Sequence, residues 1–205
     1  MCERTAWKLA SQMGWFSSYG KKKARKAPAG PPVHDDLVAY QDEHGVTRHS
    51  FRTEKVNALW LTDITEHHTG EGKLYTCMVK DVAFRRIVGY SIGPKMTATL
   101  AVDALANAVV CRKREGQNLE GCIVHSDCGS QFRSRKYLRA LEAYGLTGST
   151  GRVGACGDNA AMESFFALLQ NNVLNRQTWP NRQSLRLAIV AWIEKPTAVV
   201  VDKKD

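Results

Sequence analysis

The sequence predicts an α/β fold in which a mixed, five-stranded sheet carries helices on its faces, in the order βββαβαβα. Three observations lead to this prediction. Five short apolar or β-branched runs are separated by turn residues, as strands are. Between and after the later runs, apolar residues recur at intervals of three and four, which is the spacing of a helix packed on one face. Apolar residues make up 43% of the chain and charged residues 24%, the balance of a globular protein.

The first expected element is a short amphipathic helix over residues 4–13, ended by Gly14. Residues 21–54 begin with a basic run and continue into a Pro/Gly cluster, so we interpret them as a linker. For the basic run we weigh direct contact with DNA against simple solvation. Its members are Lys21, Lys22, Lys23, Arg25 and Lys26.

Three strands are expected next, over residues 58–63, 74–80 and 86–92. The turns between them are short and contain glycine or charged residues, which favours an antiparallel meander. Thr97 then stands where an N-cap is needed, and the apolar repeat that follows it predicts a helix as far as the basic residues 112–114.

The remaining elements alternate between strand and helix. A strand is expected over residues 122–125, then a helix capped by Ser134, then a last short strand over 146–149. A Gly-rich loop leads into a helix that Asp158 is expected to cap, and a final helix is expected from about Ser184. The chain of 205 residues is long enough for one main domain.

Charge and cysteine content narrow the functional classes. The chain has 29 Lys and Arg against 20 Asp and Glu, a net charge of +9, which favours a polyanionic partner such as nucleic acid. Its six cysteines form no CxxC pair, so a zinc site is not expected. No run approaches the roughly 20 apolar residues that span a bilayer, and the N-terminus lacks the apolar segment of a secretory signal. We therefore expect a cytoplasmic protein with no membrane partner.

Three carboxylates occupy positions that could converge. We expect Asp63 to close the first strand of the meander, Asp127 to follow the 122–125 strand, and Glu163 to lie one turn into the helix after Asp158. Three carboxylates gathered together repel one another unless cations bind between them. Oxygen ligands without thiolate or imidazole partners select Mg²⁺ or Mn²⁺, and two such ions suit phosphoryl transfer. The alternative is that all three are ordinary solvated residues.

Several stretches in order resemble the catalytic core of bacterial insertion-sequence transposases related to retroviral integrases. They are WLTDIT (60–65), EGKLYTCMVKD (71–81), RRIVGYSI (85–92), HSDCGSQF (125–132) and GRVGACGDNAAMESFF (151–166). The family pattern is Asp, Asp and then Glu after 35 residues, and 35 residues separate Asp127 from Glu163. The resemblance implies that Asp63, Asp127 and Glu163 are the catalytic and metal-binding triad of a ribonuclease-H-like fold, holding two Mg²⁺ or Mn²⁺ ions per site.

The resemblance also implies a domain arrangement and partners. Residues 55–194 would be the integrase-like catalytic core, and residues 1–20 the end of an upstream helical DNA-binding region. The implied activity is metal-dependent cleavage and strand transfer of DNA during transposition. The implied partners are element ends and target DNA, further copies of the chain in a homo-oligomer, and a DNA-binding protein from an upstream reading frame. A bacterial protein of this kind would associate with the nucleoid when bound to DNA.

Two departures from the family pattern support an alternative. Cys128 stands where relatives carry a basic residue, and residues 195–205 differ from the family's aromatic, Arg/His-rich continuation. We interpret that tail as truncated or frameshifted, so the alternative is a catalytically inactive DNA-binding remnant of a transposase. A ribonuclease-H-like nuclease with other substrates is a third hypothesis. His125 is interpreted either as positioning a ligand or as a structural histidine, and it is not included in the catalytic set.

Overall fold

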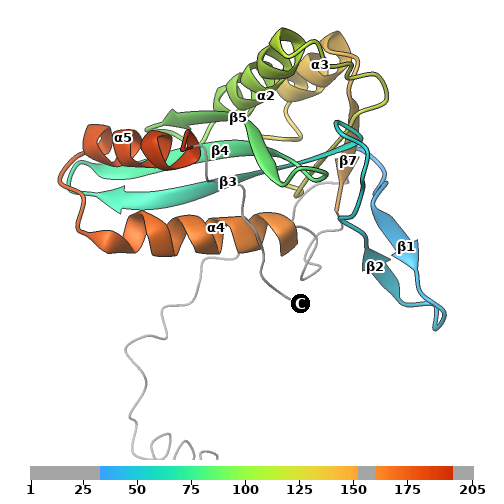
Figure 1. Cartoon of the computed structure of the whole chain (residues 1–205), viewed down its shortest axis with the longest axis horizontal. Helices are drawn as coiled ribbons and strands as arrows, with labels where there is room; N and C mark the ends of the chain where they lie inside the picture. Colours follow the sequence, from blue (N-terminus) through green and yellow to red (C-terminus); the bar gives the residue numbers. More distant parts are fainter. Residues whose placement is uncertain (1–32, 152–159, 196–205) are drawn as a thin grey trace, which may run out of the picture.

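A five-stranded mixed sheet forms the centre of the protein in a computed structural model that describes residues 33–151 and 160–195 (Figure 1). The order across the sheet is β5-β4-β3-β6-β7. The strand bounds are β3 Leu59–Thr69, β4 Gly72–Asp81, β5 Arg86–Gly93, β6 Ile123–Ser126 and β7 Thr147–Thr150. β3, β4 and β5 form the predicted antiparallel meander, whereas β6 and β7 run parallel to β3. The predicted fold class is confirmed.

The first strand is longer than predicted. β3 continues to Thr69, so Asp63 lies within the strand and does not close it. The strand was expected to end where the apolar run gives way to polar residues. Pairing with β4 nevertheless continues, from Trp60 opposite Asp81 to Thr69 opposite Gly72, because backbone hydrogen bonding does not depend on apolar side chains.

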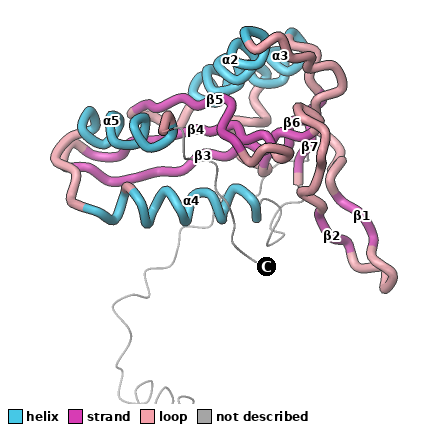
Figure 2. The backbone as a smooth tube through the Cα atoms, in the orientation of Figure 1, coloured by secondary structure: helices cyan, strands magenta, loops and turns pink. Residues whose placement is uncertain are grey.

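Helices cover both faces of the sheet (Figures 1 and 2). One face carries α2, Ala98–Arg114, and α3, Arg135–Ala143; the other carries α4, Ala160–Asn172, and α5, Arg182–Ile193. A 3₁₀ turn, η1, spans Leu174–Arg176 between the last two helices.

The ends of the helices follow their capping residues. The hydroxyl of Thr97 accepts a hydrogen bond from the backbone N–H of Leu100, and that of Ser134 accepts one from Tyr137, as predicted. The final helix begins slightly earlier than expected, because Asn181 caps it by accepting a hydrogen bond from the N–H of Ser184. The predicted helix 4–13 and the predicted cap Asp158 lie outside the described residues.

Side chains of the central strand β3 point alternately into two hydrophobic cores, one on each face of the sheet. Trp60 is fully buried in the core under α2 and α3, whereas its neighbours Leu59 and Leu61 pack in the core under α4 and α5. Successive side chains of a strand point to opposite faces of the sheet, so a strand covered on both sides needs an unbroken apolar run. Residues 59–61 supply that run, and it fixes the face on which every later residue of β3 lies.

A glycine sets how closely α2 approaches the sheet. A Cβ atom added at Gly89 in β5 would overlap the backbone nitrogen of Ala108 and the carbonyl oxygen of Ala104. Only glycine leaves room for helix backbone at that distance. Ala104 and Ala108 are themselves fully buried, so small residues on both elements create this contact.

A hairpin lies inside the segment that the sequence analysis interpreted as a linker. β1, Ala39–Gln41, pairs with β2, Thr47–His49, and the side chain of Asp42 accepts hydrogen bonds from the turn backbone. Linker is therefore the wrong description for this part of residues 21–54. Its strands are three residues long and mostly polar, so they lacked the alternating apolar pattern of a predictable strand.

No helix within the two described ranges is long and apolar enough to cross a bilayer.

Candidate functional site

The parallel pairing of β3 with β6 sets the positions of two of the predicted carboxylates. The last paired residues are Leu61 and His125. Two residues further along each chain stand Asp63, still within β3, and Asp127, just past the carboxyl end of β6. Because each carboxylate comes two residues after the Leu61–His125 pair and the strands are parallel, Asp63 and Asp127 lie side by side at the same edge of the sheet.

Asp63 faces the layer formed by α4 and α5. It shares its side of β3 with Leu59 and Leu61, which pack in the core beneath those helices. One oxygen of Asp63 accepts a hydrogen bond from the N–H of Ile64 at 2.7 Å. Asp127 is exposed, and its Oδ1 accepts a hydrogen bond from the N–H of Gly129 at 2.9 Å.

Glu163 lies in the first turn of α4, on the same side of the sheet as Asp63. Its neighbour Met162 is fully buried against the sheet, and Glu163 itself is exposed. Adjacent helix residues are about 100° apart around the axis, so burial of Met162 holds Glu163 at the margin of the contact between helix and sheet. Asp158 would precede this turn but lies outside the described residues.

The other two carboxylates act electrostatically on Asp63. Burial raises the pKa of Asp63 to about 7, with further increases from the negative charges of Asp127 and Glu163 and an opposing effect of the Ile64 hydrogen bond. Burial dominates because it removes water from the charged form, and the two carboxylates add repulsion. Asp63 is therefore poised between its neutral and charged forms near neutral pH.

The donor set suits a hard divalent cation. The three groups are carboxylates, the ligands that Mg²⁺ and Mn²⁺ prefer, and a cation would relieve the repulsion that raises the pKa of Asp63. Within residues 33–151 and 160–195, no three His, Cys, Asp or Glu side chains are close enough to form one coordination sphere. Asp63 thus lies within electrostatic reach of the other two carboxylates, but the three groups are not gathered around a single point.

Two interpretations were considered for His125, and its burial and hydrogen bond favour a structural histidine. It is fully buried, with Nδ1 2.9 Å from Oγ of Ser149 on the neighbouring strand β7. Its ring lies against Phe51 and His49, with centroids 6.0 and 6.4 Å away. Ser149 Oγ also accepts a hydrogen bond from the N–H of Leu37. The segment around the hairpin therefore packs two residues from Asp127, a contribution that the sequence reasoning missed because the hairpin itself was not predicted.

Cys128 has a backbone partner. Its thiol donates a hydrogen bond to the carbonyl oxygen of Gly151 at 2.8 Å. A thiol in this position adds no positive charge beside Asp127, unlike the basic residue of the family pattern. The predicted DNA-contacting run, Lys21, Lys22, Lys23, Arg25 and Lys26, lies outside the described residues.

Sequence comparison places this geometry in a known group. Residues 53–156 match the integrase core domain family. The chain is 37% identical over 165 residues to the transposase InsF for insertion sequence IS3A of Escherichia coli strain K12, covering 80% of this chain and 53% of that protein. It is 35% identical over 144 residues to the transposase for insertion sequence element IS629 of Shigella sonnei, covering 70% and 47%. The chain thus spans about half the length of these relatives.

Solved structures agree on the fold. A chain of the simian T-cell lymphotropic virus intasome, in complex with PP2A regulatory subunit B56 gamma, superposes with a TM-score of 0.57 at 14% identity, covering 93% of this chain and 64% of that one. The HTLV-2 integrase catalytic core domain in complex with magnesium superposes with a TM-score of 0.52 at 18% identity, covering 69% and 88%. The sheet order, the matched residues and these superpositions lead to one conclusion: the chain belongs to the integrase core domain family, and within it is similar to bacterial insertion-sequence transposases.

Proposed function

We propose that this chain is the catalytic core of a DNA transposase that performs metal-dependent strand cleavage and strand transfer, with Asp63, Asp127 and Glu163 as its catalytic carboxylates. The observation that carries the proposal is the pair Asp63 and Asp127. They stand abreast at the end of the β3–β6 pairing, where burial and the charge of Asp127 raise the pKa of Asp63 to about 7. Family membership supports the same reading.

The proposed cofactor is Mg²⁺ or Mn²⁺, with two ions per site. The magnesium named for the HTLV-2 integrase core supports the choice of metal, and the all-oxygen donor set fits it. Such ions would activate a water or 3′-hydroxyl for in-line attack on a phosphodiester and stabilise the leaving oxygen. Asp63 and Asp127 hold their places through the sheet, and Glu163 completes the donor set from α4.

The proposed partners are the element's ends, target DNA and further copies of this chain. The E. coli and Shigella relatives are named as transposases for insertion sequences, and the HTLV-2 core is described in trimeric and dimeric forms. The basic residues between Lys21 and Lys26 would contact DNA phosphates, which position a duplex without reading its bases. A DNA-binding protein from an upstream reading frame would supply end recognition, in the cytoplasm and at the nucleoid.

Assays of strand transfer and 3′-end nicking test the proposal. Their substrates are labelled duplexes that carry the terminal repeats of the element encoding this chain. The substitutions Asp63→Asn, Asp127→Asn and Glu163→Gln are each expected to lower the rate at least about a thousandfold, because each removes a charged metal ligand. Asp103→Asn removes an exposed carboxylate from α2, in the opposite layer, and should leave the rate unchanged. Products that persist in EDTA, or in all three site variants, would contradict the proposal.

A second candidate is a catalytically inactive, truncated DNA-binding remnant, and the environment of Cys128 favours it. The thiol is directed to the carbonyl of Gly151 and provides no charge for a phosphate. Cys128→Arg separates the two candidates. A charge-assisted phosphate contact is worth about 1–3 kcal/mol. If the native chain is inactive and the arginine variant nicks DNA, the site is assigned correctly and the remnant reading holds. An active native chain rejects the remnant.

A further inference from the structure

A recess of about 280 Å³ lies between the end of β4, the β4–β5 turn and α4. Its polar lining consists of Lys80 from β4, Arg85 from the turn, and Ser164 and Asn171 from α4, and Phe165 forms part of its apolar wall. Within residues 33–151 and 160–195, no acidic residue lines it. All four polar side chains can donate a hydrogen bond, and two of them are cationic. The recess is therefore suited to an anion.

The pairing of β4 with β3 places this recess beside the proposed catalytic carboxylates. Lys80 pairs with Leu61, whereas Asp63 pairs with Met78, two residues before Lys80 on β4. Leu61 and Met78 both pack in the core under α4 and α5, so this is the face on which Lys80 and Asp63 lie. Diagonal neighbours on one face of an antiparallel pair are about 7–8 Å apart. The recess therefore adjoins Asp63.

Lys80 holds a positive charge at the inner side of the recess. The residue is only 8% exposed. Its Nζ donates a hydrogen bond to the carbonyl oxygen of Ala161 at 3.2 Å and lies 5.7 Å from the centre of the Phe165 ring. Both of these groups are neutral, so these contacts hold the ammonium in place without cancelling its charge. A charge at the edge of the protein interior attracts an anion more strongly than one in bulk water.

The β4–β5 turn presents Arg85 in a fixed backbone conformation. Arg85 has a φ of 53°, which is uncommon for a residue with a side chain. Asp81 anchors the turn, because its Oδ1 accepts a hydrogen bond from the N–H of Ala83 and its Oδ2 accepts one from Arg112 in a buried ion pair, both at 2.9 Å. A strained conformation persists only where the surrounding structure holds it. The core therefore holds the turn that displays Arg85.

We propose that this recess binds a backbone phosphate of the DNA that is held at the neighbouring carboxylates, with Arg85 as its main ligand. The inference rests on the proposed function, because it takes DNA as the substrate. Ser164 and Asn171 are seven residues apart, so they lie on one face of α4 and donate further hydrogen bonds from there. Phosphates recur about every 3.4 Å along each strand of a duplex, so a strand that passes Asp63 brings several within reach of the recess.

An exposed aromatic ring beside Arg85 favours a nucleic-acid phosphate over a free phosphate ion. Phe84 precedes Arg85 in the turn and is 58% exposed. Aromatic rings next to cationic groups are what nucleic-acid-binding surfaces offer to bases. Inorganic phosphate should therefore release DNA no better than chloride at equal ionic strength. Selective release by phosphate would identify the free ion as the occupant and overturn the proposal.

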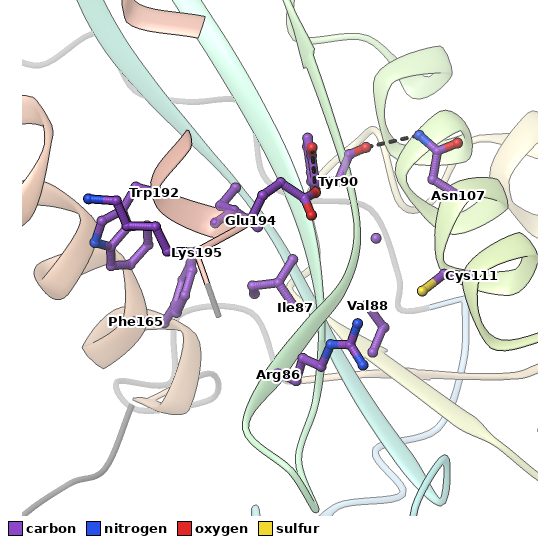
Figure 3. Close-up of a pocket in the computed structure, with 12 residues that line it drawn as sticks. Arg86, Ile87, Val88, Tyr90, Asn107, Cys111, Phe165, Trp192, Glu194 and Lys195 are labelled. Atoms are coloured by element: carbon purple, nitrogen blue, oxygen red, sulfur yellow. Dashed lines mark hydrogen bonds between the residues drawn. The ribbon is translucent and has the colours of Figure 1, made fainter. Parts of the chain in front are cut away.

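Two adjacent arginines provide a matched pair of variants. Arg86 lines a different cavity, of about 610 Å³, and forms an ion pair with Glu115 at 3.0 Å (Figure 3). Fluorescence anisotropy of a labelled duplex, recorded in EDTA over a series of salt concentrations, measures the affinity of each chain. Arg85→Gln should weaken binding about tenfold and reduce the slope of log K against log salt concentration by about 0.9. Arg86→Gln should change neither quantity, and equal effects of the two substitutions overturn the proposal.

Two adjacent asparagines of α4 give a second matched pair. Asn171 lines the recess, whereas Asn172 does not and donates a hydrogen bond to the carbonyl oxygen of Leu168 at 2.8 Å. Both residues are exposed. Asn171→Asp places a carboxylate against the bound phosphate and should weaken DNA binding at least about tenfold. Asn172→Asp adds the same charge outside the recess and should weaken it at most about twofold. Equal weakening by both would point to a general field and overturn the proposal.

The two assays keep this inference separate from the proposed function. Binding in EDTA needs no turnover, whereas nicking does. In the nicking assay, Arg85→Gln should raise the KM for duplex DNA about tenfold. A native chain that binds DNA through Arg85 but never nicks it would refute the proposed function and leave the recess assigned. A native chain that nicks DNA, with neither affinity nor KM altered by Arg85→Gln, overturns the recess alone.

Discussion

At the scale of single residues, the charge of Asp63 links the stability of the protein to pH. Its pKa of about 7 lies well above the ordinary 3.8, mainly because of burial. The folded state therefore retains a proton that the unfolded chain releases between about pH 4 and pH 7. Stability must fall as the pH rises through that window and stay low above it, in the absence of divalent ions.

Asp63→Asn removes that liability. Asparagine keeps an oxygen to accept the hydrogen bond from Ile64 but has no charge. In EDTA at pH 8.5, we expect the variant to unfold at a higher urea concentration than the native chain. The difference in unfolding free energy between the variant and the native chain should be larger at pH 8.5 than at pH 5, on the order of 1–3 kcal/mol. Mg²⁺ should narrow the gap by stabilising only the native chain. A difference that is the same at both pH values, or one reproduced by Asp103→Asn, would count against this account.

At this scale, the sequence predicted where two of the three carboxylates lie in the fold. The position of Asp127 just after a strand was predictable from the apolar run before it, and so was Glu163 beside a buried stripe. The location of Asp63 within β3 was not, because residues 64–69 are mostly polar and remain in the strand through pairing with β4. The packing of Phe51 and His49 against His125 depends on a hairpin without an apolar pattern, so only tertiary structure reveals it.

At the scale of elements, β5 and α2 pack closely at Gly89. Capping at Thr97 made α2 predictable from local sequence, whereas its distance from the sheet depends on Gly89, whose meaning emerges only when the helix is in place. The same limit applies to the start of α5, since both Asn181 and Ser184 are suitable caps and packing decides between them.

Gly89→Ala should force α2 away from the sheet. The new methyl group would overlap helix backbone, which cannot rotate aside, and we expect a loss of at least about 2 kcal/mol in the free energy of unfolding. Gly93→Ala on the same strand is the matched control, because its methyl would meet only the flexible end of Leu100 at 3.3 Å. Urea denaturation of both variants decides the matter: equal losses would mean that strand propensity and not helix contact is responsible.

At the scale of the whole molecule, two features matter most for the fold and for binding. One is the pair of hydrophobic cores on opposite faces of the sheet, and the other is the excess of positive charge. The βββαβαβα order was readable because each element has its own periodicity. The pairing of β3 with β6 sets Asp63 and Asp127 abreast and joins segments about 60 residues apart, so it depends on the topology of the sheet and not on local sequence.

The net charge of +9 predicts salt-sensitive DNA binding. Each phosphate contact contributes about 0.9 to the slope of log K against log salt concentration. Replacing Lys21, Lys22, Lys23, Arg25 and Lys26 with glutamine should lower that slope by roughly 2–4 if most of them contact phosphates. Fluorescence anisotropy across a series of salt concentrations measures it. The exposed residues Lys113 and Arg114 at the end of α2 provide a control pair, and an equal fall per charge there would indicate a diffuse field instead of a defined contact.

The short pairing of β3 with β6 also bears on how such a protein can diverge. Only three residue pairs join the two strands, and Asp127 comes two residues after the last of them. Insertions between α2 and β6 leave that count untouched, so the spacing between the first two carboxylates is free to drift among descendants. A single inserted residue between Ile123 and Asp127 would turn the carboxylate towards the opposite layer. We therefore expect insertions and deletions to be tolerated in the loop before Ile123. In the four residues from Ile123 to Ser126 they should not be tolerated.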